Sequence, residues 1–353
     1  MLTDIEISGF KSILKKTFPL RKLTLLSGFN NSGKSTVIQA LRMFCNSYEK
    51  NIPLLTGHGA VDEIRSKFVI SSEPISFKCG FKNNRVELFS LNERGFSKPG
   101  TAPLICYISA DRWGPKISLP IDRTLGEFPV IGDHGEYVIG FLDALRNVIV
   151  PPHLHHPNAQ GSTLEYQIMG WMEEIAPGID LKYEIDSKRD SAHVEFDSFR
   201  PTNVGFGLSY CLPILASILG MASQEPVNGW DNEWGNDWEF QKKSRGILLM
   251  LENPEAHLHP SGQTALGRLI ALGARAGLQL IVETQSDHLM DGIRISIREE
   301  ILEPSEVIFH YLTRNKDGET EFLTPEINRL GKLSFWPDGF FDQTLKNRSK
   351  LAR

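Results

Sequence analysis

The sequence has few cysteines and no long apolar run. Its four cysteines, Cys45, Cys79, Cys106 and Cys211, show no CxxC spacing, and at least three lie in apolar stretches, which suits reduced core thiols. No stretch approaches the ~18 apolar residues of a membrane span. The N-terminus MLTDIEISGF alternates like a strand and lacks the apolar core of a signal peptide. We therefore expect a soluble, cytoplasmic protein that does not contact a membrane.

The chain also lacks an excess of positive charge. Its 353 residues carry a net charge of −5, so any contact with nucleic acid would have to come from a local patch. The segment FKSILKKTFPLRK is one candidate, through Lys11, Lys15, Lys16, Arg21 and Lys22. Such a cluster is more commonly a solvated basic face. Nucleic acid therefore stays a candidate partner, with a basic surface as the simpler interpretation.

What the sequence does contain is an alternation of strands and helices. Apolar or alternating runs at 2–10, 21–31, 103–110, 181–186, 192–197, 246–252 and 278–284 predict strands. Helical spacing predicts helices at 34–48, 137–150, 162–178, 208–222, 261–277 and 287–301. Strands that alternate with helices on this scale indicate an α/β core with a mostly parallel sheet.

Three tryptophans recur every fourth residue in the segment NGWDNEWGNDWEF. Trp230, Trp234 and Trp238 are interleaved with acidic residues. One interpretation is an insertion loop whose tryptophans fold back on the domain. The other is a protein-docking site of exposed tryptophans rimmed by acids.

The segment GFNNSGKST fits the phosphate-binding pattern G-x-x-x-x-G-K-[ST] between Gly28 and Ser35, after an apolar strand and before a helix. Gly28 and Gly33 allow the backbone to curl so that N–H groups face phosphates. The helix that starts near Lys34 directs its positive end at them. A glycine-rich turn before an ordinary helix would not explain the lysine–hydroxyl pair. The pattern therefore predicts binding of ATP with Mg²⁺.

A second motif, LLMLENPEAHLHP, is an apolar strand that runs into Glu252 and Asn253. In P-loop ATPases a carboxylate at such a strand end holds Mg²⁺, and the next residue is usually a catalytic glutamate. Here the next residue is an amide, which can orient water but cannot act as a base. This substitution predicts slow hydrolysis.

The histidines offer a metal-site alternative that we consider weaker. His257 and His259 cannot share a helix face at their spacing, and His153, His155 and His156 follow two prolines in a predicted loop. No cysteine or acidic ligand is spaced to complete a site.

The stretches IEISGFKSI…LTLLSGFNNSGKST, LLMLENPEAHLHP and LIVETQSDHLM together resemble the SMC/RecF/OLD group of ABC-type ATPases. More narrowly, YISADRWGP, VGFGLSYCLP, ENPEAHLHP and WPDGFFDQ resemble a bacterial subfamily of short AAA-family ATPases with a C-terminal domain of unknown function, associated with anti-phage defence. The resemblance implies an α/β fold: an ABC-type P-loop NTPase head with a mixed sheet. The insertion of strands and helices would lie between Walker A and the signature-like motif. The implied domains are an ATPase core at 1–50 and 196–325, an inserted lobe at 51–195 and a short C-terminal segment at 326–353.

The resemblance also implies site residues. Glu252 occupies the Walker B position, and it would hold Mg²⁺ together with Ser35. The signature-like motif VGFGLSY would meet the nucleotide of a second copy through Gly205, Gly207 and Ser209. The residues implied in nucleotide binding are Gly28, Asn30, Asn31, Ser32, Gly33, Lys34, Ser35 and Thr36.

Two departures from the family pattern bear on catalysis. Asn253 occupies the usual place of the catalytic glutamate, and Gln285 occupies that of the switch histidine. Glu255 is the other carboxylate of the motif. It could substitute as the base, or it could be a structural carboxylate that caps or pairs nearby.

Three functions follow from these observations. The first is an ATP-dependent switch that pairs with a second copy around ATP and controls a separate effector such as a nuclease or toxin in anti-phage defence. The second is a RecF-like ATPase of DNA repair or maintenance. The third is a nucleotide-bound scaffold that does not hydrolyse ATP.

Overall fold

The computed structural model describes residues 1–70, 73–122, 128–337, 339, 347 and 349–351. The chain forms two compact units: residues 1–105 with 303–353, and residues 106–302. We refer to them as the first and second units. These two units are groups of residues that pack together. The domains predicted from the sequence are instead drawn around the ATPase motifs, so the units do not test them. The division into an ATPase core and an inserted lobe therefore stays a prediction.

One sheet of the first unit is antiparallel, with the order β2-β1-β4-β5-β6. Its inner face is apolar because β1 and β4 present every second residue to the core: Ile5 and Ile7 lie opposite Cys79 and Phe77. The short helix of this region is α2, Val61–Ile64. The strands are β1 (Leu2–Phe10), β2 (Ile13–Pro19), β4 (Ile75–Phe81), β5 (Val86–Asn92) and β6 (Gly95–Ser97).

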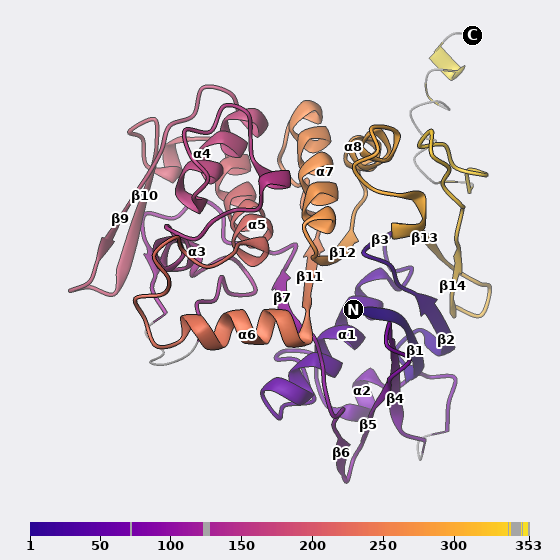
Figure 1. Cartoon of the computed structure of the whole chain (residues 1–353). Coiled ribbons are helices and arrows are strands. Elements are labelled where there is room, and N and C mark those ends of the chain that lie inside the picture. Colours follow the sequence, from indigo (N-terminus) through magenta and orange to yellow (C-terminus); the bar gives the residue numbers. More distant parts are fainter. Residues whose placement is uncertain (71–72, 123–127, 338, 340–346, 348, 352–353) are drawn as a thin grey trace. The chain divides into compact units, whose positions relative to one another are not determined.

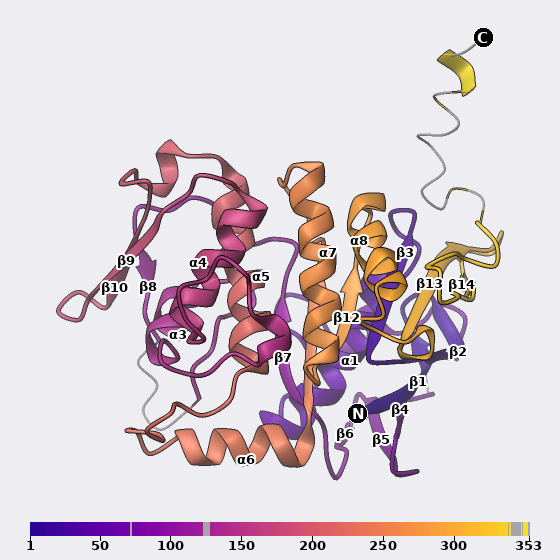
Figure 2. The ribbon, with the colours of Figure 1, turned by 45° about the horizontal axis from the view of Figure 1, so that its top comes forward.

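The other strands of the first unit position the predicted phosphate loop. Strand β3, Leu23–Gly28, is almost wholly buried and leads through the loop into α1, Lys34–Glu49. It pairs in parallel with β13, Val307–Arg314, which pairs antiparallel with β14, Thr320–Leu323 (Figure 2). The short 3₁₀ helix η3, Pro304–Glu306, precedes β13. Parallel and antiparallel pairs in one sheet confirm the predicted α/β fold with a mixed sheet.

The second unit contains a parallel strand pair with a helical crossover. Strand β11, Ile247–Glu252, pairs in register with β12, Gln279–Glu283, and α7, Pro260–Arg275, connects them. Helix α8, Asp287–Arg298, runs beside α7 (Figure 1). The two helices approach closely at glycines: a Cβ on Gly292 would lie 2.2 Å from the carbonyl oxygen of Thr264.

The rest of the second unit is mostly helical. The helix expected at 137–150 is shorter than predicted: α3 spans Val138–Ala144, and the chain turns before it reaches Pro151. The remaining helices are η1 (Pro152–Leu154), α4 (Leu164–Ile175), η2 (Pro201–Asn203) and α5 (Phe206–Ala222). An antiparallel sheet has the order β8-β10-β9, with β8 at Leu119–Pro120, β9 at Leu181–Asp186 and β10 at Ser191–Phe196. Strand β7, Leu104–Ile108, spans the boundary between the two units.

The tryptophan segment folds back on its own unit. Trp238, on α6 (Gly235–Arg245), is only 1% exposed, and Trp230 and Trp234 are half-buried. The three rings contact one another at centroid distances of 5.1–5.9 Å. The interpretation as exposed docking tryptophans is therefore wrong, because Trp234, the N-cap residue of α6, and Trp238, one turn later, pack their rings against each other and against Trp230.

The four cysteines are free thiols in the structure. Cys45, Cys79 and Cys211 are buried, and no disulfide joins the four cysteines, all of which lie in the described part of the chain. Burial raises the pKa of the Cys211 thiol to about 12, which keeps it protonated and unreactive. Among the described residues, no helix combines the length and apolar character needed to cross a bilayer.

Candidate functional site

The loop between β3 and α1 has the backbone conformation that the phosphate-binding pattern predicts. Gly28, Asn31 and Gly33 adopt positive φ values of 138°, 65° and 105°. Gly28 also lies against β13, where a Cβ would come 2.1 Å from the carbonyl oxygen of Leu312. The two glycines are therefore required by conformation and by space. Asn30 and Asn31 are exposed at the tip of the loop.

The polar groups of this loop suit an anion. The Lys34 side chain is buried, and its Nζ donates to the carbonyl oxygens of Gly28 and Phe29 at 3.0 Å, which curls it over the loop. Gly33, the N-cap residue of helix α1, provides no side-chain cap, and the first turn of α1 has no acidic residue, so the positive end is not neutralised from within the helix. The buried Oγ of Ser32 has no hydrogen-bond partner among the described residues. The residues present therefore fit a bound phosphate.

Ser35 and Thr36 lie in the first turn of α1, where the sequence predicted them. The Thr36 N–H already donates to the carbonyl oxygen of Gly33 at 3.1 Å. The two predicted Mg²⁺ ligands lie in different units: Ser35 belongs to the first unit and Glu252 to the second.

In the second unit, β11 ends in a constrained turn. Glu252 lies opposite Glu283 in the strand register, and the Asn253 N–H donates to the Glu283 carbonyl oxygen at 2.8 Å. Asn253 adopts φ +43°, which an asparagine tolerates better than most residues. Its buried Oδ1 accepts no hydrogen bond from any described residue. The turn therefore holds the side-chain amide of Asn253 close to the end of β11, and the Oδ1 atom of that amide accepts no hydrogen bond from the described residues.

Glu255 is the buried carboxylate of this turn, 8% exposed. Its Oε1 accepts the Gln285 N–H at 3.0 Å, whereas its buried Oε2 has no hydrogen-bond partner within the described ranges. Burial raises the pKa of Glu255, opposed by the Gln285 N–H, the Thr284 hydroxyl and the positive charge of Arg112. The contact with the Gln285 N–H is compatible with the structural alternative, a carboxylate that caps nearby. The raised pKa and the unused oxygen suit a proton acceptor. The side chain of Gln285 itself is exposed.

Sequence reasoning missed Arg112, which is 2% exposed and holds this turn. Its guanidinium donates to the carbonyl oxygens of Glu252 and Asn253, both at 2.8 Å, and to that of Ser109 at 2.9 Å. It also lies 5.1 Å from the ring centre of Tyr210 on α5. An arginine directly after an apolar strand, in YISADR, was the only signal in the sequence.

The signature-like residues lie at the start of α5, beside the same segment. Gly205 is the N-cap residue, and a Cβ on Gly207 would lie 2.7 Å from the carbonyl oxygen of His257. The His257 ring packs against Tyr210 at 4.7 Å. The second unit therefore brings Gly207 together with the segment after Asn253, whereas a Cβ added to Gly205 would meet no atom within 4 Å.

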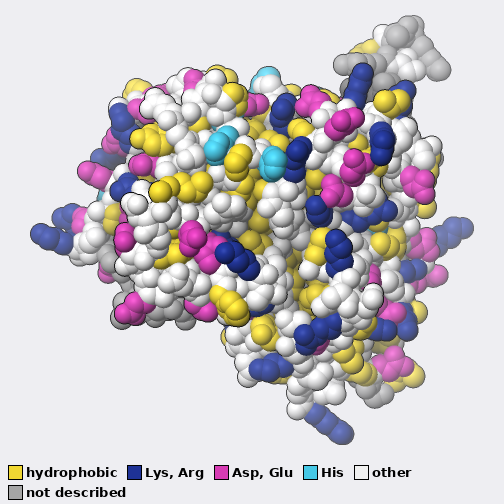
Figure 3. All heavy atoms as spheres, in the orientation of Figure 1, with side chains coloured by type: hydrophobic (Ala, Val, Ile, Leu, Met, Phe, Trp, Pro, Cys, Tyr) yellow, Lys and Arg dark blue, Asp and Glu magenta, His cyan; other side chains and the backbone are white. Residues whose placement is uncertain are grey.

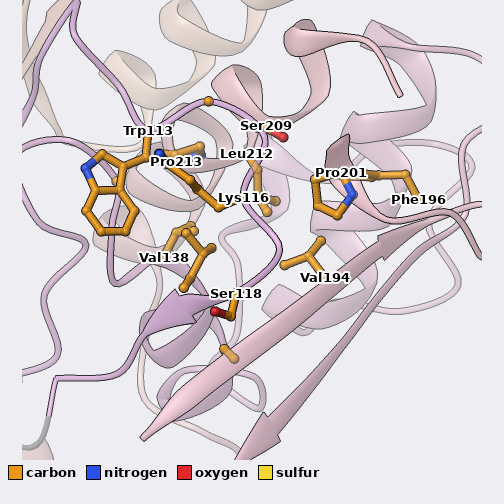
Figure 4. A pocket seen from close by; sticks show the side chains of 14 residues that line it. Trp113, Lys116, Ser118, Val138, Val194, Phe196, Pro201, Ser209, Leu212 and Pro213 are labelled. Carbon is orange, nitrogen blue, oxygen red and sulfur yellow. The ribbon is translucent and has the colours of Figure 1, made fainter. Parts of the chain in front are cut away.

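Ser209 points elsewhere, into a small cavity between α5 and β10 (Figure 4). Leu212 and Pro213 of α5 face Val194 and Phe196 of β10 there. At about 30 Å³ the cavity has room for water but not for a nucleotide.

The histidines considered as metal ligands include His156, which is buried in the second unit. His156 contacts the Glu174 carboxylate at 2.6 Å and the ring of Trp171 at 5.2 Å. Within the described residues, no group of three or more His, Cys, Asp and Glu side chains could hold a metal ion.

The basic segment near the N-terminus is largely paired within its own unit. Lys15 lies 3.7 Å from Glu6, Lys16 lies 3.8 Å from Glu319, and Lys22 lies 2.6 Å from Glu306. Figure 3 shows one face of the molecule, on which Lys and Arg side chains are interspersed with Asp and Glu. Neither observation favours a nucleic-acid patch.

Three protein-family models match separate parts of the chain. Residues 1–94 match "AAA ATPase domain", and residues 149–291 match "AAA domain, putative AbiEii toxin, Type IV TA system". Residues 302–351 match "Protein of unknown function (DUF3696)". No curated protein matches the sequence.

Remote similarities to solved structures extend over most of the chain. An SMC head bound to the C-terminal winged-helix domain of ScpA is 13% identical, with 92% of this chain and 97% of that chain covered and a TM-score of 0.48. The SMC head domain from Thermotoga maritima is 11% identical, with 92% and 99% covered and a TM-score of 0.45. The recombination mediator RecF bound to ATP is 11% identical, with 92% and 99% covered and a TM-score of 0.45.

Proposed function

We propose that this chain, a P-loop ATPase by its loop geometry and family matches, is an ATP-controlled switch that acts through a partner protein. The observation that carries the proposal is the loop of the first unit. Gly28 and Gly33 are required by the backbone, Lys34 lies over the loop, and the N-terminus of α1 is not neutralised from within the helix.

Magnesium would be held by few protein groups. Ser35, at the start of α1, and Glu252, at the end of β11, are the proposed ligands beside the nucleotide phosphates. Mg²⁺ usually binds through one or two carboxylates with phosphates and waters, and a dedicated protein cage is not needed. When bound, the ion would neutralise charge on the phosphates.

Hydrolysis would be slow. Asn253 can orient water but cannot accept its proton, and Gln285 cannot act as an imidazole. Glu255 is the proposed base because its carboxylate is buried, has an elevated pKa and keeps one oxygen unused. A slow step suits a switch because the ATP-bound state must persist long enough to be recognised.

The proposed ATP-bound state is a pair of copies, in which Gly205 and Gly207 would face the partner's nucleotide; Ser209, which lines the cavity beside β10, is not included. The proposed effector is a separate nuclease or toxin, in anti-phage defence. The match to a model described with a putative toxin of a type IV toxin–antitoxin system supports a two-component role. The paired lysines of the N-terminal segment give no support to the RecF-like alternative.

The test is ATP binding by calorimetry in wild type and Lys34→Ala. Loss of the charge-assisted contact, worth roughly 1.5–3 kcal/mol, would weaken affinity about tenfold to a hundredfold. Lys15→Ala is the matched control, since Lys15 is an exposed lysine of the same unit, and it should bind ATP as wild type does. Equal affinity in Lys34→Ala and wild type would reject the phosphate site. Binding without any turnover would favour the scaffold.

A further inference from the structure

Among the residues matched as a protein of unknown function, Thr320 makes a hydrogen bond to the phosphate loop. Thr320, the first residue of β14, is fully buried. Its Oγ1 donates to the carbonyl oxygen of Ser32 at 3.0 Å, and it lies 2.7 Å from Ser12 Oγ. Its own N–H donates to the Ser12 carbonyl oxygen at 2.8 Å. All of these residues belong to the first unit.

Proton counting fixes the direction of this chain of hydrogen bonds. A threonine hydroxyl has one proton, and Thr320 donates it to Ser32. Ser12 must therefore donate to Thr320 Oγ1. The hydroxyl of Thr320 is thus held by a donor on one side and an acceptor on the other, inside a buried site where such bonds are strongest.

The approach of Thr320 depends on Gly33. A Cβ at position 33 would lie 2.3 Å from Thr320 Oγ1 and 2.9 Å from its Cγ2. The glycine therefore serves a second purpose beside its φ of 105°: it leaves room for the β14 side chain behind the loop.

A trans peptide places the C=O of one residue and the N–H of the next on opposite sides. With the Ser32 carbonyl directed to Thr320, the Gly33 N–H must point away from β14. We infer that Thr320 is a positioning residue for the nucleotide: it fixes the Ser32–Gly33 peptide so that the Gly33 N–H is presented to a phosphate. The inference rests on the proposed ATP binding. It assigns a task in that binding to a residue within the part of the chain matched as a protein of unknown function.

The experiment compares Thr320→Val with Thr320→Ser, using calorimetry with ATP. Valine keeps the shape of threonine but removes the hydroxyl, so the peptide is no longer held and ATP affinity should fall about tenfold. Serine keeps the hydroxyl and should restore most of the affinity. Thr324→Val is the matched control, because Thr324 lies just after β14 and its hydroxyl contacts His310 at 2.9 Å and not the loop.

A purely structural role would lower the melting temperature of Thr320→Val and Thr324→Val alike and leave the ATP dissociation constant of both unchanged. That result would overturn the inference. A second readout is the backbone amide resonance of Gly33 without nucleotide, which should shift in Thr320→Val and not in Thr324→Val. If wild type binds no ATP, the proposed function fails, whereas the amide resonance still decides on Thr320: no shift would reject it.

Discussion

A buried histidine beside the phosphate-loop strand makes the stability of the first unit depend on pH. His310 lies on β13, directly opposite Leu26 of β3. Its Nε2 lies 2.8 Å from the Pro19 carbonyl oxygen, and its Nδ1 lies 2.9 Å from Thr324 Oγ1. Burial lowers the pKa of His310 from 6.5 to about 4, so the folded protein keeps the imidazole neutral at pH 7.

The magnitude follows from the two pKa values. Between about pH 4 and pH 6.5 the imidazole binds more protons in the unfolded chain than in the folded one, so the free energy of unfolding falls as the pH drops. Between pH 6.5 and pH 4 the decrease in the free energy of unfolding approaches about 3 kcal/mol. Between pH 7 and pH 5 it amounts to about 2 kcal/mol.

The assay is urea unfolding at pH 7 and pH 5 for wild type and His310→Gln. Glutamine can hydrogen bond on both sides but does not titrate in this range. We expect the variant to be less stable than wild type at pH 7 but to lose about 2 kcal/mol less on going to pH 5. His193→Gln, at an exposed position of β10, controls for the removal of a histidine. An equal loss in wild type and His310→Gln would refute the reasoning.

Two further predictions concern packing and turnover. Gly292→Ala should destabilise the protein by about 2 kcal/mol, because the added methyl meets a backbone oxygen at 2.2 Å. Gly140→Ala, where the methyl meets a side-chain carbon at 3.6 Å, should be neutral or stabilise α3 by up to about 1 kcal/mol in the same thermal unfolding assay; equal losses would contradict the packing argument. Wild-type ATP turnover should lie well under ~10 s⁻¹, and Asn253→Glu should raise it. Glu255→Gln should abolish turnover, and an unchanged rate would exclude Glu255 as the base.

The phosphate loop was predictable because its residue types are dictated locally. The apolar run of β3 requires burial, Gly28 and Gly33 mark backbone that other residues resist, and Lys34 opens a helix with clear periodicity. The same local logic predicted β11 up to Glu252, and the extents of β9 and β10 to within a residue.

What escaped prediction depends on contacts between distant segments. Arg112 reads as a surface arginine in the sequence, and only the fold brings it to carbonyl oxygens about 140 positions later. The contact between Thr320 and Ser32 is equally non-local. The tryptophans were different: the spacing of Trp234 and Trp238 was visible, but the surrounding acids and glycines suggested a loop and outweighed the helical period.

The pairing of β3 with β13 also bears on how the protein is made. Val307 lies opposite Leu23, 284 residues earlier in the chain. At about 5–20 residues per second, a ribosome would need roughly 15–60 s to synthesise the chain between them. During that time the residues of the phosphate loop have been synthesised, but β13, which pairs with β3, and Thr320, whose hydroxyl holds Ser32, have not. A chain that terminates before Thr320 would therefore contain the motif but lack the hydroxyl that holds Ser32, so the proposed nucleotide site can be completed only after synthesis has passed Thr320.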